Sequence, residues 1–569
     1  MEKRGSHPPH GRRAYARDIC TDKVDWETVK QWLACCQSEH SDSCGSTTST
    51  SLPGFAVIDC FTRRIVCAPE GCKYAALSYV WGSETAPSIR SDIPIPAPPL
   101  IEDAMICTRA MGLQYLWVDR YCINQADNTK CVLIHNMDRI YSQATITIIN
   151  AAGESSSSGL PGVSDVARRP YTSMTAQNHH LVLFPNTRTE IEQSKWSKRA
   201  WTFQEGLLSR RRLVFTSSQI YFQCQETHYW EMIPLPFSSQ PIDLDQWVSE
   251  GLDATLGPNT CVFPIIEPRS NASKVNALIR EYLRREMSYE ADVLNAIIGI
   301  LRHVCSHFWG LPFEPWGFGM TPLPNQAHPD SAFLAALLWK PEYETKGTIS
   351  KRSNFPSWSW VAYKGITGIK QGSLFWDACD TSVDVRIQDR THYTLHVWEY
   401  LQEMERKYDT YRYKPCVYLT GWVTYMRFRC CGVPWDATLS PGEPMSLVAL
   451  DKSLTTIIGS VTIMTSLLEH SASGLKKLFE LEWPVLLYMN ESVTDNLCGL
   501  VLRPLGNDRY QRLGTLDSHR CPGREWRMEG NVACLSRVSK GLTSGHGSPD
   551  ILLPSVETLD CEWDTIELR

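Results

Sequence analysis

Three short runs of almost wholly apolar residues constrain this chain more than any other feature. They read YAALSYVWG (residues 74–82), YLWVD (115–119) and TITIIN (145–150). Runs of this length that are apolar on both faces are typical of strands buried between two layers, as in parallel sheets. The segments between them carry apolar residues at helical spacing. Strands and helices that alternate in this way predict right-handed crossovers, so we expect an open, mostly parallel α/β sheet over residues 70–225.

The rest of the chain divides by composition. Residues 1–50 are polar apart from the amphipathic piece DWETVKQWLACC, and they end in a serine-rich linker. The α/β domain is expected to span residues 51–225 and to begin with a β-hairpin. Residues 226–350 look mainly helical, and residues 351–569 contain apolar runs separated by turns, which indicates a β-rich C-terminal region. In the segment FPSWSW, Trp358 and Trp360 stand two apart, as on one face of a strand.

Composition excludes several classes of protein. The chain has 569 residues, 43% of them hydrophobic, which suits two or three domains with substantial cores. A net charge of −6 gives no reason to expect a nucleic-acid partner. There is no run of apolar residues long enough to predict a membrane span. The first residues lack the apolar segment of a secretory signal, so the 21 cysteines are expected to stay reduced, in the cytoplasm or the nucleus, and we expect a cytoplasmic protein.

Polar and aromatic residues follow the strands of the predicted sheet. Tyr79, Trp81 and Gly82 close the first strand, Asp119, Asn124 and Gln125 follow the second, and residues 150–153 follow the third. Ligands of open α/β sheets bind beyond the carboxyl ends of the strands, so these residues are candidates for a ligand rim. The same residue types are equally typical of turns, and Asp119 is also suited to capping the loop that follows it.

The segment RAWTFQEGLLSRR (residues 199–211) places Glu205 four residues after Trp201. On a helix these side chains lie one above the other, so the indole and the carboxylate could together receive a planar, positively charged group. The alternative is structural: a buried Trp201, and a Glu205 paired with a neighbouring arginine. The arginines 210–212 likewise suit a solvated helix end favoured by the helix dipole, or a clamp for phosphate groups.

Taken in order, YAALSYVWG, LQYLWVDRYCINQAD and RAWTFQEGLLSRR resemble the three sequence blocks of the fungal heterokaryon incompatibility (HET) domain. The resemblance implies a part in non-self recognition, in which such proteins trigger growth arrest and cell death after incompatible hyphae fuse. HET domains are also held to be distant relatives of TIR domains, whose flavodoxin-like sheets agree with the fold predicted above. Many TIR domains cleave NAD with a glutamate in a W-x-x-x-E helix after the third strand, and Trp201 and Glu205 have that spacing. The long loop between the third strand and this helix departs from the TIR pattern.

The resemblance implies that Glu205 is catalytic and that NAD is a candidate substrate. The carboxylate would stabilise the positive charge that develops on the ribose as nicotinamide leaves. An indole would stack on the nicotinamide ring, and an arginine would hold the pyrophosphate. The candidate substrate-binding residues are Trp81, Gly82, Asp119, Asn124, Gln125, Arg199, Trp201 and Arg211, with Arg210 as a further candidate for the pyrophosphate. There is no glycine-rich dinucleotide fingerprint, so we expect neither hydride transfer nor NAD as a firmly bound cofactor.

Two other functions stay open at this stage. In one, the HET fold acts by self-association as a signalling or scaffold module, without catalysis. In the other, the C-terminal β-rich region binds a partner and regulates it. Self-association through the HET domain is the partner contact that we expect, and the sequence does not identify the protein that triggers it.

The N-terminal segment WLACCQSEHSDSC raises the question of a metal site. Cys36, His40 and Cys44 follow one another at intervals of four, which on a helix would align three ligands for zinc, with Cys20 or Cys35 as the fourth. This segment has no C-x-x-C pair, however, and it turns serine-rich. We therefore predict no metal site.

Overall fold

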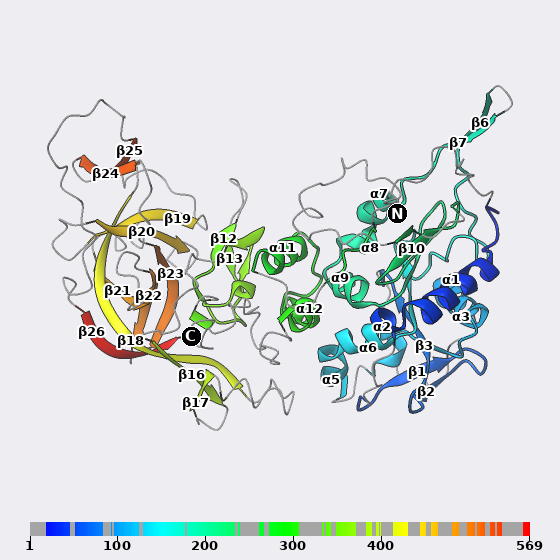
Figure 1. Ribbon diagram of the computed structural model, residues 1–569. Helices are drawn as coiled ribbons and strands as arrows, with labels where there is room; N and C mark the ends of the chain where they lie inside the picture. Colours follow the sequence, from blue (N-terminus) through cyan, green and yellow to red (C-terminus); the bar gives the residue numbers. More distant parts are fainter. Residues whose placement is uncertain are drawn as a thin grey trace, which may run out of the picture. The chain divides into compact units, whose positions relative to one another are not determined.

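The computed structural model divides the chain into two compact units, one formed by Met1–Ile266 with Arg285–Ile300 and the other by Glu267–Arg284 with Leu301–Arg569 (Figure 1). The structure describes residues 19–45, 52–82, 93, 96–124, 129–176, 179–233, 237–238, 261–266, 272–305, 333–334, 337–342, 349–370, 383–389, 394–397, 399, 413–430, 444–450, 457–464, 481–488, 498–506, 509–517, 524–529, 532–537 and 561–568. None of the helices among these residues has the length and apolar character that crossing a bilayer requires.

A nine-stranded sheet forms the centre of the first unit. In spatial order its strands are β11 (Phe237–Ser238), β10 (Thr227–Trp230), β9 (Ile220–Gln223), β8 (Arg212–Phe215), β5 (Ile146–Asn150), β3 (Tyr74–Ser78), β4 (Tyr115–Trp117), β1 (Ala56–Asp59) and β2 (Arg64–Cys67). The central strands β8, β5, β3 and β4 run parallel. The three apolar runs are therefore neighbouring parallel strands, as predicted. The sheet as a whole is mixed and not mostly parallel, because antiparallel pairs extend both of its edges.

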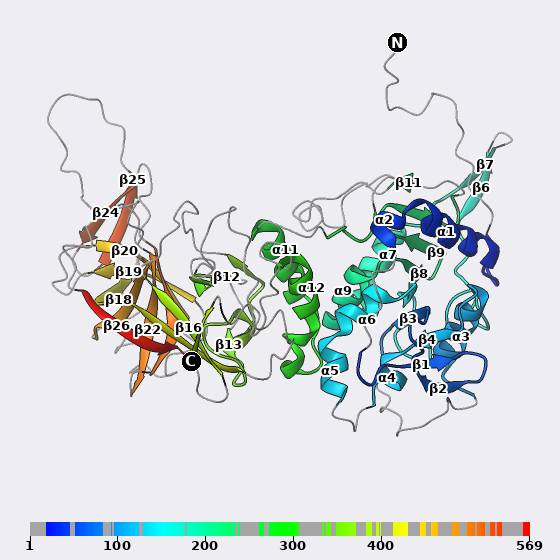
Figure 2. The same ribbon diagram turned by 60° about the horizontal axis from the view of Figure 1, so that its bottom comes forward.

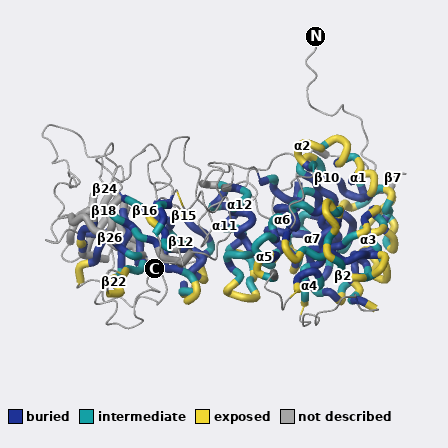
Figure 3. Tube along the Cα trace, turned by 90° about the horizontal axis from the view of Figure 1, so that it is seen from below, coloured by how far each residue is buried: buried dark blue, intermediate teal, exposed yellow. Residues whose placement is uncertain are grey.

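Helices cover both faces of the central strands. The helices α1 (Trp26–Glu39) and α3 (Pro99–Ala110) lie on one face, and α6 (Met137–Gln143) and α9 (Ala200–Leu208) lie on the other (Figures 1 and 2). This double cover explains why β3 and β5 are buried along their whole length. In Figure 3 the interior of this unit is dark blue, and the yellow, exposed residues lie at its outside.

The order of the parallel strands locates the place where such sheets bind ligands. In chain order β4, β3, β5 and β8 are the second, first, third and fourth parallel strands, which is the order of open doubly wound sheets. The direction of the crossovers then reverses between β3 and β5. Ligands bind at this switch point, beyond the carboxyl ends of the strands.

The connections between the strands contain more regular structure than the sequence predicted. The second predicted helix is broken at Asn136 into α5 (Thr129–His135) and α6. The stretch expected as a long loop before residue 195 contains a hairpin of β6 (Ser173–Ala176) and β7 (His179–Val182), and the helix α7 (Thr187–Gln193). The short helix α8 (Lys195–Lys198) follows and leads into α9.

The N-terminal helix α1 belongs to the first unit and shares its core. Asp25 caps the helix by accepting the backbone N–H groups of Glu27 and Thr28, each at 3.2 Å. On the buried face of α1, Trp32 stacks on Tyr229 of β10 with the ring centroids 5.5 Å apart. The piece DWETVKQWLACC, predicted to be amphipathic, therefore contributes an apolar helix face to the sheet.

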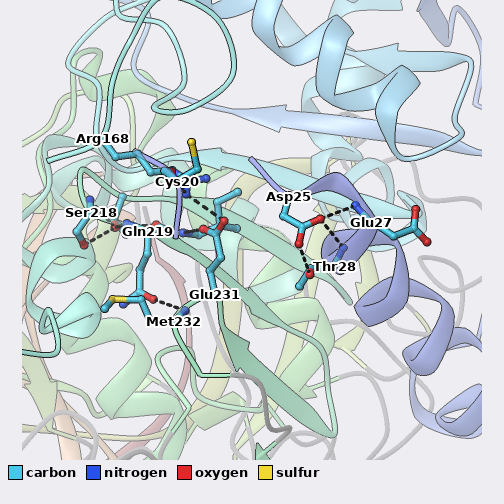
Figure 4. A network of polar contacts seen from close by, with 11 residues as sticks. Cys20, Asp25, Glu27, Thr28, Arg168, Ser218, Gln219, Glu231 and Met232 are labelled. Atoms are coloured by element: carbon cyan, nitrogen blue, oxygen red, sulfur yellow. Dashed lines mark hydrogen bonds and ion pairs between the residues drawn. The ribbon is translucent and has the colours of Figure 1, made fainter. Parts of the chain in front are cut away.

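A buried ion pair holds the chain that leads into α1. The guanidinium of Arg168 donates to Glu231 at 3.0 Å and to the backbone carbonyl of Cys20 at 3.2 Å (Figure 4). The second carboxylate oxygen of Glu231 accepts the N–H of Ile220 at 3.1 Å. Both charged side chains are almost fully buried, and buried charges of this kind are stable only when they are paired.

The second unit is rich in β-structure, as predicted. Its larger sheet contains β16 (Asp384–Asp389), β17 (Thr394–His396), β18 (Tyr413–Cys430), β19 (Pro444–Leu450), β20 (Ile457–Met464), β21 (Trp483–Tyr488), β22 (Cys498–Gly506), β23 (Arg509–Asp517) and β26 (Cys561–Leu568). The smaller pairs are β12 (Lys340–Glu342) with β15 (Gly368–Lys370), β13 (Ser350–Lys351) with β14 (Tyr363–Lys364), and β24 (Arg524–Glu529) with β25 (Val532–Arg537). The helix α11 (Ala272–Leu283) also belongs to this unit, and α12 (Asn295–Cys305) begins in the first unit and ends in the second.

The prediction of a strand at Trp358 and Trp360 is wrong. Trp358 lies in a turn, and Trp360 begins the 3-10 helix η3 (Trp360–Ala362), in which Ser359 accepts the N–H of Val361. Both indoles are buried, and the backbone carbonyl of Trp358 accepts the indole N–H of Trp339 at 2.8 Å. The spacing by two agrees with the burial of both indoles. The backbone nevertheless forms a turn, because the side chain of Ser359 caps it.

Candidate functional site

The carboxyl group of Glu205 lies at the carboxyl edge of the central strands. All residues of α9 except Trp201 are buried, and Glu205 itself is only 5% exposed. Ser78, the last residue of β3, donates its hydroxyl to Glu205 Oε2 at 2.5 Å. An otherwise apolar helix therefore holds one buried acid against the end of the first parallel strand.

The serine that holds Glu205 is itself held. The indole N–H of Trp196 in α8 donates to Ser78 Oγ at 2.7 Å, so the hydroxyl proton of Ser78 is directed toward Glu205. The hydroxyl of Tyr141 in α6 lies within hydrogen-bonding reach of the Glu205 carboxyl and of the Leu77 carbonyl, the latter at 3.1 Å. A charge held by fixed donors needs little rearrangement during a reaction.

Asp119 places a second acid at the same edge. It opens the short helix α4 (Asp119–Cys122) directly after β4, and its Oδ1 accepts the N–H of Arg120 at 2.7 Å. Its Oδ2 accepts the indole N–H of Trp81 at 2.8 Å. Because Trp81 follows β3, this contact joins the ends of two neighbouring parallel strands.

The two acids change charge close to neutral pH. Burial raises the pKa of Glu205 to about 7, and the negative charge of Asp119 adds to this increase. Burial also raises the pKa of Asp119 to about 6, against the hydrogen bond from Trp81, although part of the side chain keeps exposed surface. Acids that influence each other titrate as a pair. A pair that titrates near neutral pH suits acid–base chemistry, although structural networks also shift pKa values.

A cation and a buried hydroxyl adjoin the pair. Arg199 donates to the backbone carbonyl of Tyr79 at 3.0 Å, and its charge lowers the pKa of both Glu205 and Asp119. The hydroxyl of Tyr79 is buried and has no hydrogen-bond partner among the residues that the structure describes. Buried hydroxyl groups are normally paired, so within the described part of the chain this one keeps an unused donor next to the acid pair.

The other predicted residues of the rim differ in their surroundings. Trp201 is partly buried and forms a hydrogen bond with Asp292, so Trp81 is the indole that is bonded to the acid pair. Gly82 adopts φ +79°, and a Cβ there would come within 2.7 Å of the Ser155 side chain, so this turn requires glycine. Asn124 is exposed two residues after α4. The predicted residue Gln125 lies outside the described residues.

Arg211 is placed at the opposite edge of the sheet. Its guanidinium donates to the carbonyl of Thr145, directly before β5, at 3.2 Å, and to the carbonyl of Cys44 at 2.9 Å. These groups lie at the amino ends of β5 and β8, whereas Glu205 lies at the carboxyl end of β3. The structure therefore does not bring Arg211 together with the acid pair, and we do not assign it to a substrate.

The expectation of a solvated helix end at residues 210–212 is wrong. Arg210 donates to the carbonyl of Gly45 at 2.5 Å, and Arg212 donates to the carbonyl of Leu207 at 2.7 Å. Arg212 is almost fully buried and also lies over the ring of Phe263. The arginines thus satisfy backbone oxygens that a helix end leaves without donors.

Strand ends pointed to Tyr79, but sequence reasoning missed three residues of this site: Ser78, Tyr141 and Trp196. Ser78 had a readable signal, because it is the polar residue in an otherwise apolar strand. The sequence predicts Tyr141 only as part of an apolar helix face, and it predicts no element at Trp196, between the expected loop and the helix at 200–209. Their hydrogen bonds to distant residues could not be read from spacing.

The arrangement brings two acids, an arginine, an indole and a free hydroxyl to the edge where doubly wound sheets bind ligands. Such a group can stabilise a developing positive charge, accept one proton near neutral pH and hydrogen-bond a polar substrate.

Residues 74–205 match the family model described as heterokaryon incompatibility protein (HET). The match begins at the first residue of β3 and ends at Glu205, so it contains β3, β4, β5 and both acids. No curated protein and no solved structure gives a match.

Proposed function

From the premise that this chain is a HET domain protein, with a role related to heterokaryon incompatibility, we propose that its HET domain hydrolyses NAD at the bond between nicotinamide and ribose. The observation that carries the proposal is the buried Glu205, held by Ser78 at the switch point of the sheet with a pKa of about 7. The strand order supports the further proposal that the domain is a distant, TIR-like relative of flavodoxin-like sheets.

The reaction requires few catalytic groups from the protein. The bond between ribose C1′ and the pyridine nitrogen breaks, and its electron pair leaves with neutral nicotinamide. Water then attacks C1′, a proton is released, and ADP-ribose forms. The transition state carries positive charge on the ribose, so one carboxylate that faces the ring stabilises it, as in glycoside hydrolysis.

Each group of the site has a role in this reaction. The ionised Glu205 stabilises the charge on the ribose and accepts the proton from water, and Ser78 holds it in place. Trp81 offers its indole face to the cationic nicotinamide ring. Arg199 binds the pyrophosphate, and Tyr79 hydrogen-bonds a ribose hydroxyl.

The biological proposal follows from the same chemistry. Removal of NAD from the cytoplasm kills a cell, so the protein would act as a death effector in non-self recognition. Self-association of HET domains in response to a protein trigger would switch it on. If the fold acts by self-association alone, toxicity will not depend on the carboxylate.

The test uses the full chain at high concentration with NAD, and nicotinamide release is followed by chromatography. We expect release by the natural chain and its loss in Glu205→Gln, which keeps the shape of the side chain. Glu192→Gln, in a partly exposed ion pair with Arg188, is the matched control and should remain active. If folded protein leaves NAD intact at every concentration, or if Glu205→Gln remains toxic in cells, the catalytic proposal fails.

A further inference from the structure

The strongest unassigned feature is a cluster of cysteine and histidine side chains at the amino edge of the central strands. The ligand atoms of Cys36, His40, Cys44 and Cys224 all lie within 4.8 Å of one another. The three cysteines are fully buried and His40 is partly exposed. We infer that these four residues form a structural zinc site that fastens the N-terminal helices to the HET sheet.

The backbone of the N-terminal segment sets three of the ligands on one face. Helix α1 ends at Glu39, and α2 (Ser41–Cys44) begins after His40, whose backbone leaves the helical conformation. The N–H of His40 donates to the Cys36 carbonyl at 3.2 Å, and the N–H of Cys44 donates to the His40 carbonyl at 2.8 Å. Each of these hydrogen bonds spans four residues, as in a helix, and the side chains of Cys36, His40 and Cys44 come together despite the break at His40.

The fourth ligand comes from far along the chain. Cys224 follows β9 in the turn that leads to β10, and its Sγ accepts the N–H groups of Glu226 at 3.4 Å and of Thr227 at 3.2 Å. Donors of this kind orient and stabilise metal-bound thiolates. The residues expected as the fourth ligand do not take part, since Cys20 is exposed and Cys35 accepts the hydroxyl of Tyr229 at 3.4 Å.

The geometry fits a tetrahedral ion. With Zn–S of about 2.3 Å and Zn–N of about 2.0–2.1 Å, tetrahedral angles place a sulfur and a nitrogen ligand about 3.6 Å apart. Cys224 Sγ and His40 Nδ1 are 3.5 Å apart. Three thiolates and one imidazole are a usual ligand set for structural zinc, and soft thiolates disfavour calcium and magnesium.

The surroundings also balance the charge of such a site. One Zn²⁺ with three thiolates and a neutral imidazole carries a net negative charge. Arg211 supplies the compensating positive charge, because its Nε donates to Cys36 Sγ at 3.0 Å and another guanidinium nitrogen donates to the Cys44 carbonyl. This contact gives the buried Arg211 a role that the acid pair does not offer, and it ties the site to the end of α9.

The test measures metal content and is independent of NAD cleavage. The full chain is purified without chelator from zinc-containing medium, and its zinc is determined by mass spectrometry. We expect about one zinc per chain, as for a closed four-ligand site. After removal of zinc, titration with Co²⁺ should give the intense absorption of a tetrahedral thiolate complex.

Neighbouring cysteines provide matched variants. Cys36→Ser and Cys224→Ser should each lower zinc retention by about tenfold or more. Cys35→Ser, one residue from a ligand, and Cys131→Ser, at an exposed position, should leave it unchanged. If the ligand variants do not fold, the zinc content and Co²⁺ spectrum of the natural chain decide. Absence of stoichiometric zinc and of the Co²⁺ spectrum overturns the inference, as does retention of zinc by folded Cys36→Ser and Cys224→Ser, or disulfide bonds among these cysteines in freshly purified protein.

Discussion

The two edges of the central sheet treat buried charge in different ways. At the carboxyl edge, Glu205 is buried beside Asp119, and both carboxyl groups have raised pKa values. At the amino edge, Arg211 and Arg212 are also buried, but each donates to backbone oxygens. Burial lowers the pKa of Arg212 to about 10, so the charge there also has a cost, but backbone carbonyls offset part of it.

The difference separates a candidate reactive site from a structural one. Among the described residues no ion pair involves Glu205, so the salt bridge to a neighbouring arginine that the sequence also allowed is not what holds it. A buried acid without a paired cation is expensive. Natural proteins keep such groups mainly where chemistry uses them.

The largest expected effect concerns activity at the carboxyl edge. Glu205→Gln should lower nicotinamide release by about 10²- to 10³-fold, the usual loss when one preorganised electrostatic contact to a transition state is removed. A variant that keeps more than a tenth of the natural rate, measured on folded protein, would place Glu205 outside the chemistry.

The second effect concerns stability and has a definite sign. The pKa of Glu205 rises from 4.5 in the unfolded chain to about 7 in the fold, so the folded state holds a proton that the unfolded state releases between these values. Stability from this group is fully present below pH 4.5 and is lost as the pH rises to about 7, with a total of about 3 kcal/mol. Glu205→Gln removes this loss, so relative to the natural chain the variant should gain stability from pH 5 to pH 8.

Denaturant midpoints at the two pH values measure this gain, with Glu192→Gln as the control that should show none. A structural role for Glu205 predicts the reverse, namely that the variant is destabilised at both pH values. Loss of activity together with a gain of stability at pH 8 would sharpen the contrast between the two edges of the sheet.

The third effect concerns the amino edge. Arg211→Ala should destabilise the fold by about 2 kcal/mol, since it leaves the buried carbonyls of Cys44 and Thr145 without donors. The KM for NAD of the folded variant should not change. A raised KM would indicate that Arg211 binds the pyrophosphate. The amino edge would then not be purely structural.

The smallest effect concerns the coupling within the acid pair. The charge of Asp119 raises the pKa of Glu205, so Asp119→Asn should move the midpoint of the pH–rate profile to lower pH. Rates measured from pH 5 to pH 9 show the shift. An unchanged midpoint would mean that the two carboxyl groups do not titrate as a pair.

The central fold could be predicted because its signals are local. The runs at β3, β4 and β5 are apolar because both of their faces are covered, and period and length reveal this without a partner. The antiparallel pairs that make the sheet mixed have weaker patterns, and their place at the edges depends on distant pairing. The turn at Trp358 depends on a serine cap that outweighs the spacing of the indoles.

The site could be predicted only in part. The spacing of Trp201 and Glu205 pointed to Glu205, and strand ends pointed to Asp119 and Trp81, which the structure places at the same edge of the sheet. The contact of Ser78 with Glu205 joins residues 127 positions apart, and that of Cys224 with His40 joins residues 184 apart. Contacts between residues so far apart produce no periodic pattern in a single sequence. This is also why the burial of the three arginines 210–212 could not be predicted.

The position of the cysteine–histidine cluster affects how this protein should be cut for experiments. The stretch that matches the HET family ends at residue 205, so Cys36, His40, Cys44 and Cys224 all fall outside it. A fragment trimmed to that stretch would also lack β8, which completes the parallel strands, and α1, which covers one face. If such a fragment fails to fold or to react, the cause would be the missing cluster, strand and helix. The result would say nothing about the chemistry of the intact domain.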